Sequence, residues 1–457
     1  MNRAGVSDLR RGFSGRLLHP GDDGYDAARQ IWNGAIDRRP ALIARCASVD
    51  DVLAAVKFAR GEQLLVAIRG GGHNVAGTAV CDGGLMIDLS PMKGTAVDPA
   101  RRMAHVQPGV LWGDLDREAQ AFGLAVPGGI VTHTGVAGLT LGGGIGWLMR
   151  KHGLTCDSLF AADMVTADGH FVRASETEHP DLFWGIRGGG GNFGIVTSFE
   201  FQLHPVGPAV LAGLVLYPAD QAQQVLRFYR DFAATAPDEL TTIVTFRHAA
   251  PLPLLPRHLH GAPVIVVGAC YSGPIEDGER ALLPLRTFRP PLVDLIGPTA
   301  YAGHQSIFDA GVPHGLRYYW KSHYLPDLSD GVIDAITRYG WQTPSPQSYT
   351  ILFQLGGAVA RRDDGETAFT GRTAGYAINI NAVGTDPAQD RTHERWVREF
   401  WNALQPFSTG VYMNFLGNEG RERVRTAYGP RKYERLVALK NTYDPTNFFR
   451  LNQNIAP

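Results

Sequence analysis

The chain of 457 residues has few cysteines, no excess of charge of either sign and no long hydrophobic run. Its four cysteines are too few for a disulfide scaffold at this length. Lysine and arginine number 43 against 44 aspartates and glutamates, so the basic footprint of a nucleic-acid-binding protein is missing. No stretch approaches the ~18 apolar residues of a membrane span, and residues 1–11 lack the apolar core of a signal peptide. We therefore expect a cytoplasmic protein that binds neither nucleic acid nor membrane.

Glycine, in contrast, is abundant, with 55 residues. The cluster Gly70-Gly71-Gly72 follows an apolar run at 64–68, which we interpret as a buried strand because it is short, aliphatic and ends abruptly in glycine. Three glycines let backbone N–H groups converge without a Cβ in the way, which makes a nest for an anion such as a pyrophosphate. For an isolated triplet, a glycine-rich hairpin without a ligand would be the favoured interpretation. Arg69 before it and His73 after it favour a binding loop.

Strands and helices are mixed irregularly in the first 205 residues. Expected strands are 64–68, 85–89, 103–106, 160–166, 170–173 and 195–203, and expected helices are 48–60, 112–122 and 147–152. No amphipathic helix follows Gly72, so the context of a Rossmann dinucleotide fingerprint is missing. Because the elements do not repeat as regular βαβ units, they predict an α+β domain.

The composition changes at His204-Pro205. Beyond it glycine clusters become rare, and strands alternate with amphipathic helices. Examples are strands 264–269, 349–355 and 376–380 and a helix at 391–404. We expect one domain over 1–205, a second over 206–409, and a C-terminal segment, 410–457, that returns to the first.

Several motifs occur together in a distinctive order. They are Ile68-Arg69-Gly70-Gly71-Gly72-His73-Asn74, Gly142-Gly143-Gly144-Ile145-Gly146, Gly153-Leu154-Thr155-Cys156-Asp157, Gly191-Asn192-Phe193-Gly194-Ile195-Val196-Thr197, Tyr412-Met413-Asn414-Phe415, Tyr443-Asp444-Pro445 and Asn452-Gln453-Asn454-Ile455. In this combination the sequence resembles the FAD-linked oxidases of the berberine bridge enzyme-like family, within the vanillyl-alcohol oxidase superfamily. The resemblance covers nearly the whole chain.

The resemblance implies a PCMH-type FAD-binding domain of two subdomains and a substrate domain with a large antiparallel sheet covered by helices. Many family members hold the flavin by two covalent bonds. Carried over, His73 would bond the 8α position of FAD and Cys156 would bond C6 through sulfur. A neutral imidazole and a thiolate are suitable nucleophiles near neutral pH. Outside these motifs, His73 would be read as a loop residue capping a carbonyl, and Cys156 as a small buried hydrophobe.

The glycine loops would surround the rest of the cofactor. Residues 70–73 would cradle the pyrophosphate, and the loops 134–138 and 142–146 would pass close to the adenosine and isoalloxazine portions. Ile195 and Val196 would lie against the adenine end. The complete set expected at the cofactor is Arg69, Gly70, Gly71, Gly72, Asn74, Gly77, Thr134, Gly135, Gly138, Gly142, Gly143, Gly144, Gly146, Gly153, Ile195, Val196 and Asn452.

Hydride transfer to a flavin needs a base for the proton of the neighbouring hydroxyl or amine. In the family a tyrosine of a Tyr-x-Asn motif often serves, which here is Tyr412 with Asn414. The resemblance implies oxidation of a C–H next to oxygen or nitrogen in a sugar, glycoside, alkaloid or other small molecule, with O2 as acceptor. The alternatives are a dehydrogenase that uses another acceptor, an enzyme with only the histidyl link, and a flavin-carrying binding protein without catalysis. A non-catalytic Tyr412 would be a half-buried strand residue with a satisfied hydroxyl.

Three positions depart from the family pattern. Gly371 replaces an expected histidine, and Asn379 stands where many relatives carry a longer amide or a carboxylate. Ala137 replaces a glycine of many plant relatives in a loop that shapes oxygen access, which leaves the electron acceptor open. The substrate candidates are Tyr324, Tyr376 and Asn379, and the two tyrosines are also the next candidates for the base. No metal site is predicted, and the sequence does not indicate an oligomeric state.

Overall fold

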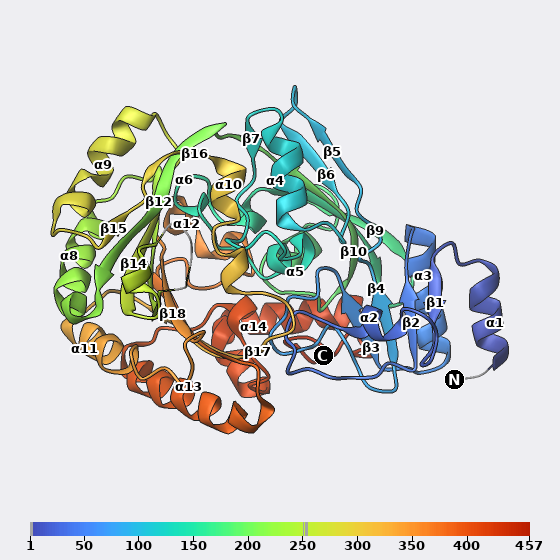
Figure 1. Ribbon diagram of the computed structural model, residues 1–457. Coiled ribbons are helices and arrows are strands. Elements are labelled where there is room, and N and C mark those ends of the chain that lie inside the picture. The colour runs from blue at the N-terminus through green and yellow to red at the C-terminus, as the bar shows by residue number, and fades with distance from the viewer. Residues whose placement is uncertain (1–2, 250, 252–254) are drawn as a thin grey trace.

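An eight-stranded antiparallel sheet dominates the structure, a computed structural model that describes residues 3–249, 251 and 255–457 (Figure 1). Its order is β15-β12-β14-β13-β18-β19-β17, and β16 also pairs with β12. The strands are β12 Ala209–Pro218, β13 Leu240–His248, β14 Pro263–Tyr271, β15 Val293–Asp294, β16 Gly297–Ala300, β17 Arg317–Leu325, β18 Tyr349–Gln354 and β19 Tyr376–Gly384.

One face of this sheet is covered by helices, which lie on the outer side of the molecule in Figure 1. They are α8 Ala222–Ala234, α9 Ile275–Thr287, α11 Asp330–Tyr339 and α13 Asp390–Leu404. Side chains alternate between the two faces of a strand. In β19, Tyr376, Ile378 and Ile380 pack against the helices, whereas Ala377 and Asn379 face the other way. The opposite face of the sheet therefore remains available for the rest of the chain.

A second, five-stranded antiparallel sheet has the order β5-β6-β10-β8-β9. Its strands are β5 Thr95–Asp98, β6 Met103–Val106, β8 Leu159–Thr166, β9 Phe171–Ser175 and β10 Gly194–Gln202. The associated helices are α4 Trp112–Gln120, α5 Val136–Leu141, α6 Met149–His152 and α7 Pro180–Ile186, and a small ladder joins β7 Leu124–Ala125 to β11 His204–Pro205. Asp168-Gly169 lies in the turn between β8 and β9.

The N-terminal residues form a four-stranded mixed sheet of order β1-β2-β4-β3. Its elements are β1 Arg16–Leu18, β2 Leu42–Arg45, β3 Val66–Arg69 and β4 Leu85–Asp88, with helices α1 Arg3–Arg11, α2 Tyr25–Arg29 and α3 Val49–Gly61. The Ser48 side chain caps α3 by accepting from Asp51 N at 3.2 Å. The Asp51 carboxylate accepts from Ala47 N at 2.8 Å. Sheets and helices are thus mixed and partly segregated, which confirms the α+β class.

The remaining elements are short, apart from the C-terminal helix α14 Arg421–Tyr443, which is broken at Gly429. They are α10 Tyr301–Gln305, α12 Ala358–Arg361, and the single 3₁₀ turns η1 Thr155–Asp157, η2 Ala219–Gln221, η3 Arg257–Leu259, η4 Asp309–Gly311, η5 Asp364–Glu366, η6 Pro387–Gln389, η7 Gln405–Phe407 and η8 Met413–Phe415. None of the helices within the described ranges is long and apolar enough to cross a membrane.

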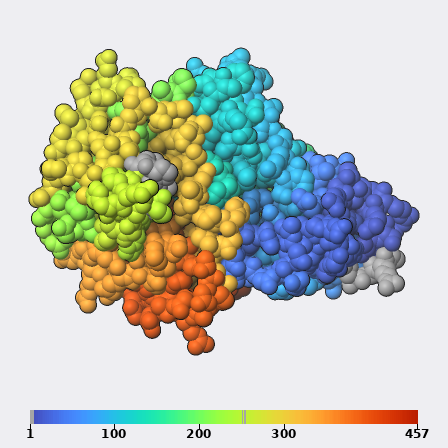
Figure 2. Space-filling model, viewed as in Figure 1, coloured from blue at the N-terminus to red at the C-terminus, as the bar shows by residue number. Residues whose placement is uncertain are grey.

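The C-terminal segment packs on residues that precede position 205. Phe448 and Phe449 belong to the core beneath β2, β3 and β4, and Ile455 belongs to the core of the five-stranded sheet. Lys440 donates to the Asn192 carbonyl at 2.8 Å. In Figure 2 the N-terminal residues and the middle of the chain form two lobes in contact. We propose the division 1–205, 206–409 and 410–457 on these grounds.

A buried carboxyl group joins the two parts of the chain. Asp116 on α4 accepts from Gln305 Nε2 on α10 at 2.9 Å, while Asp116 Oδ1 and Gln305 Oε1 are buried without a hydrogen-bond partner among the described residues. Burial raises the pKa of Asp116 to about 7, against the opposing effect of Gln305. The folded protein therefore favours the neutral acid, whose O–H is a donor.

This carboxyl group predicts a loss of stability with rising pH. From about pH 4 to about pH 7 the folded chain keeps a proton that the unfolded chain releases, so the free energy of unfolding falls across this interval and levels off above it. Asp116→Asn removes the titration, and we expect it to be roughly 1–3 kcal/mol more stable than the unmodified protein at pH 8. Urea unfolding at pH 5 and pH 8 measures this. Asp114→Asn, at a partly exposed site of α4, is the control, and an equal gain there would contradict the assignment.

Candidate active site

A deep cavity lies between the glycine loops and the uncovered face of the large sheet. Backbone and side chains from before residue 205, from β17, β18 and β19, and from after residue 410 all line it. Among the described residues, no aspartate, glutamate, lysine or arginine lines the cavity. It is therefore an apolar and amide-lined space rather than a charged one.

Most of the residues expected at the cofactor border this cavity. They are Gly70, Gly71, Gly72, His73, Asn74, Thr134, Gly135, Gly138, Gly142, Ile195, Val196 and Asn452. Two of the loops touch through their backbones, because a Cβ on Gly71 would lie 2.5 Å from Gly135 Cα. A side chain at either position would push the loops apart, which explains why both are glycine.

Six of the expected residues lie behind the lining, where they shape it. The Arg69 guanidinium donates to the Ala28 carbonyl and lies 3.8 Å from Asp88. A Cβ on Gly146 would lie 1.7 Å from Gly128 O, so this glycine permits close backbone packing. Gly144 N donates to Tyr412 Oη at 2.8 Å. The remaining three are Gly77, Gly143 and Gly153, each at a positive φ.

His73 belongs to a cluster of aromatic rings at one end of the cavity. Its ring stacks on Trp32 at 4.3 Å, and its Nε2 lies 3.1 Å from His133 Nδ1. The His314 ring lies 4.9 Å from that of His133. Burial, followed by the neighbouring His133 and His314, holds the pKa of His73 well below its ordinary value. The imidazole is thus neutral at physiological pH and has a nucleophilic nitrogen.

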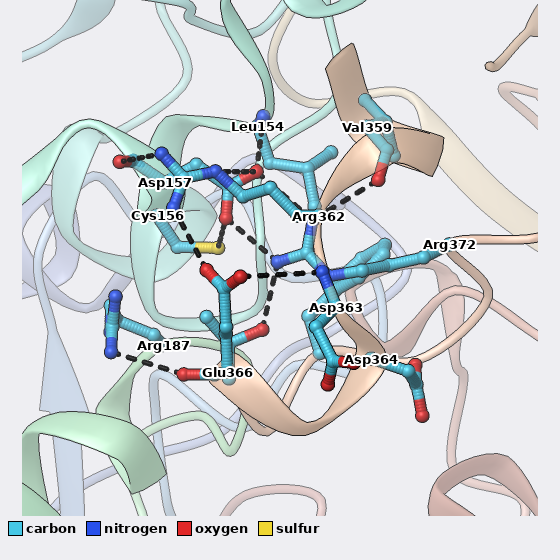
Figure 3. A network of polar contacts seen from close by, with 12 residues as sticks. Leu154, Cys156, Asp157, Arg187, Val359, Arg362, Asp363, Asp364, Glu366 and Arg372 are labelled. Atoms are coloured by element: carbon cyan, nitrogen blue, oxygen red, sulfur yellow. Dashed lines mark hydrogen bonds and ion pairs between the residues drawn. The ribbon is translucent and has the colours of Figure 1, made fainter. Parts of the chain in front are cut away.

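Cys156 is not among the residues that line the cavity. The turn η1 carries it behind the Gly143–Gly144 backbone, and Cys156 N donates to Gly143 O at 2.8 Å. Its sulfur lies 3.9 Å from Asp157 Oδ1 (Figure 3), and burial raises the pKa of the thiol above its ordinary value. In this arrangement burial disfavours the thiolate, which is the form of a cysteine that acts as a nucleophile. None of the four cysteines borders the cavity in the described part of the chain.

Tyr412 and Asn414 lie together at the centre of the cavity wall. The Tyr412 hydroxyl accepts from Gly144 N at 2.8 Å and from Asn414 Nδ2 at 2.7 Å. Burial raises the pKa of Tyr412, and these two donors oppose the shift less strongly. Asn414 is fixed in turn by donating to Leu139 O at 3.0 Å. A Cβ on Gly142 would lie 2.1 Å from Asn414 Oδ1, so glycine is needed for this arrangement.

Of the three substrate candidates, only Asn379 borders the cavity. Tyr376 is a correction, because the alternation of β19 directs it to the helix-covered face, where its ring lies 6.3 Å from that of Tyr229. Tyr324 does not border the cavity, and it is buried with its hydroxyl unpartnered among the described residues. The Tyr324 ring fills the place that a side chain at Gly371 would take, 2.2 Å from such a Cβ.

Several residues of the cavity are not predicted from the sequence. The sheet contributes Trp320, Tyr349, Ile351, Phe353 and Asn381, and other segments contribute Trp32, Gly189, Gly190, Gly191, Phe415 and Gln453. Phe415 could have been found, because it belongs to the Tyr412 motif. The glycine cluster at 188–191 was also a visible signal. The sheet residues carry no local signal, since an aromatic residue in a strand looks the same on either face.

Comparisons with known proteins agree with this geometry. Residues 40–175 match the FAD binding domain family model, and residues 411–456 match the berberine and berberine like model. The chain is 32% identical to an FAD-linked oxidoreductase of Dictyostelium discoideum, over 99% of this chain and 97% of that protein. It is 31% identical to the (R)-6-hydroxynicotine oxidase of Paenarthrobacter nicotinovorans, over 97% of each.

A comparison with solved structures gives the same result. The crystal structure of 6-hydroxy-D-nicotine oxidase from Arthrobacter nicotinovorans matches with a TM-score of 0.88 and 30% identity, covering 97% of this chain and 98% of that one. This similarity and the large antiparallel sheet confirm the fold that the sequence motifs predict.

Proposed function

The chain belongs to the berberine bridge enzyme-like family of FAD-linked oxidoreductases, and on that premise we propose that it oxidises a C–H bond next to oxygen or nitrogen of a small molecule and reduces O2. The observation that carries the proposal is the cavity that joins the loops around His73 to the Tyr412 hydroxyl. The net reaction converts CH–OH into C=O, or CH–NH into C=N, and O2 into H2O2. A relative that is 31% identical is named as an oxidase of a small molecule, (R)-6-hydroxynicotine.

The residues present suit FAD. The glycine loops offer backbone N–H groups to a pyrophosphate, and no acidic side chain lines the cavity to repel it, as judged from the described residues. Ile195 and Val196 offer an apolar surface to the adenine. When bound here, FAD would supply the acceptor for the hydride and the route by which two electrons reach O2.

We propose a single covalent attachment, through His73. If His73 Nε2–H donates to His133 Nδ1, the lone pair on His73 Nδ1 is free, and His133 is placed to hold the Nε2 proton. Attachment would join an imidazole nitrogen of His73 to the 8α carbon, with loss of one hydrogen from each and reduction of O2 to H2O2. The second link to Cys156 receives no support from the geometry, because the thiol lies outside the cavity.

This assignment predicts which variants lose the attached flavin. We expect His73→Ala to release all of its flavin on acid precipitation, and Cys156→Ala to retain all of it. His133→Phe removes the partner of the imidazole and should slow covalent incorporation when FAD is added to the apoprotein. Flavin fluorescence of the denatured protein on a gel measures all three. Flavin retained by His73→Ala, or released from Cys156→Ala, would contradict the assignment.

The Tyr412 hydroxyl is placed to handle the substrate proton. Its two donors, Gly144 N and Asn414 Nδ2, would stabilise a phenolate at this atom. Anaerobic mixing of the holoenzyme with candidate substrates, followed by exposure to O2, tests the proposed function. Flavin that bleaches and then recovers with stoichiometric H2O2 supports an oxidase. Bleaching without reaction with O2 indicates a dehydrogenase, and no bleaching with any substrate indicates a binding protein.

A further inference from the structure

The end of the cavity that lies against the large sheet is a box of aromatic rings. Trp320, Phe353 and Tyr412 surround Phe415, with ring centroids 5.8, 5.7 and 4.8 Å from it. Tyr349 and Ile351 extend the wall along β18. Walls of this kind bury flat apolar surfaces and favour offset or edge-to-face contacts with another ring.

Two amide groups interrupt the apolar wall. Asn379 and Asn381 are neighbours on one face of β19, and both are almost fully buried, with 2% and 1% of their surface exposed. Asn381 Nδ2 donates to the Asn379 carbonyl at 3.0 Å. Their Oδ1 atoms have no hydrogen-bond partner among the described residues. A buried acceptor without a partner is unfavourable, so these two oxygens are suited to donors on a bound molecule.

Charged groups are kept away from this end. Arg247 lies behind Tyr349, with its guanidinium carbon 5.9 Å from the ring centroid, and does not itself border the cavity. Lys321 points away from the cavity and pairs with Glu419. A substrate with a fixed charge would therefore lose its hydration without gaining a counter-ion. A sugar would bury many hydroxyl groups against a wall made largely of aromatic rings, whose unpartnered polar atoms among the described residues are Trp320 Nε1, Asn379 Oδ1 and Asn381 Oδ1.

We infer that the substrate is an uncharged, planar aromatic alcohol or amine whose hydrogen-bond donor groups meet Asn379 Oδ1 and Asn381 Oδ1. This inference rests on the proposed function, which identifies the oxidised group. The C–H bond of that group, from which the hydride is lost to FAD, would lie beside Tyr412. The aromatic part of the substrate occupies the box around Phe415. Its hydrogen-bond donors pair with the two asparagine oxygens, so the site discriminates against apolar and ionised analogues.

Three inert ligands of nearly equal shape test the inference: 4-hydroxybenzamide, which is neutral, 4-hydroxybenzoate, which is anionic, and 4-hydroxybenzamidine, which is cationic. Methyl cellobioside serves as the polyol. Binding to the holoenzyme is measured by calorimetry and by the shift of the flavin absorption band. We expect the amide to bind at least about tenfold more tightly than the other three. Failure of the amide to bind, or equal or tighter binding by a charged ligand or the glycoside, overturns the inference.

Variants of Asn379 and Asn381 test whether their side-chain oxygens cause the preference for the neutral amide. Asn379→Leu and Asn381→Leu should each weaken binding of the amide by about 10- to 100-fold, because a donor of the ligand loses its acceptor. Asn402→Leu, on the exposed side of α13, is the matched control and should bind normally. Unchanged binding in both cavity variants would refute the assigned contacts. If these ligands behave as expected but no oxidisable aromatic alcohol or amine reduces the flavin, the proposed function fails while the ligand class stands.

Discussion

Replacing Tyr412 by phenylalanine is expected to slow anaerobic reduction of the flavin by about 10²–10⁴-fold, the usual contribution of a general base. The substitution keeps the ring that packs 4.8 Å from Phe415 and removes only the oxygen that Gly144 N and Asn414 Nδ2 hold. Stopped-flow absorbance measures the rate. Reaction of the reduced flavin with O2 should change little, because that step does not use the substrate proton.

The pH dependence gives a second measure of the same role. Burial raises the pKa of Tyr412 above its ordinary value of 10.0, so the phenolate fraction is small at neutral pH and increases with pH. The reduction rate of the unmodified enzyme should therefore increase by up to about tenfold per pH unit below that pKa, and the slope should vanish in Tyr412→Phe.

A matched variant separates this role from a general effect of losing a tyrosine hydroxyl. Tyr376→Phe changes a buried tyrosine on the helix-covered face of the same sheet, outside the cavity. It should reduce its flavin at the unmodified rate. If the Tyr412→Phe enzyme keeps the normal rate and the normal pH slope, another group must accept the substrate proton.

Local patterns in the sequence were enough to predict most elements of the flavin part. The strand predicted at 103–106 is found as Met103–Val106, and the helix predicted at 112–122 is found as Trp112–Gln120. These segments have a clear period and end at residues that favour turns. The order of the strands could not be predicted, because β4 pairs with both β2 and β3 through contacts that no local pattern encodes.

Local sequence patterns placed some residues of the candidate site correctly but could not place others. Gly70 to His73 and Tyr412 lie at the cavity because they stand in motifs whose backbone shapes the loop. Cys156 stands in an equally recognisable motif, yet one turn of 3₁₀ helix directs its sulfur behind the wall toward Asp157. Tyr376 and Asn379 are three positions apart on one strand and therefore face opposite sides. Which side faces the cavity depends on tertiary packing.

The second large effect is expected at the buried pair formed by Asp157 and Arg372 (Figure 3). The carboxylate accepts from Arg372 at 2.7 and 3.1 Å and from Leu154 N at 2.9 Å, with 0% and 1% of the two side chains exposed. Arg372 also donates to Thr367 Oγ1 at 2.8 Å. Asp157→Asn keeps the shape and the bond from Leu154 but leaves a buried cation without its counter-ion. We expect it to lower the free energy of unfolding by about 3–5 kcal/mol, measured by urea unfolding.

The charge, rather than the lost volume, should account for this effect. Asp181→Asn is the matched control, because Asp181 pairs with Arg435 at 2.9 Å with 76% of its side chain exposed, and its loss should cost no more than about 1 kcal/mol. In the double variant Asp157→Asn with Arg372→Met, the unpaired cation is removed. Its free energy of unfolding should therefore lie above the value obtained by adding the two single effects. Strict additivity, or a loss at Asp157→Asn no larger than at Asp181→Asn, would show that this buried pair does not stabilise the folded protein.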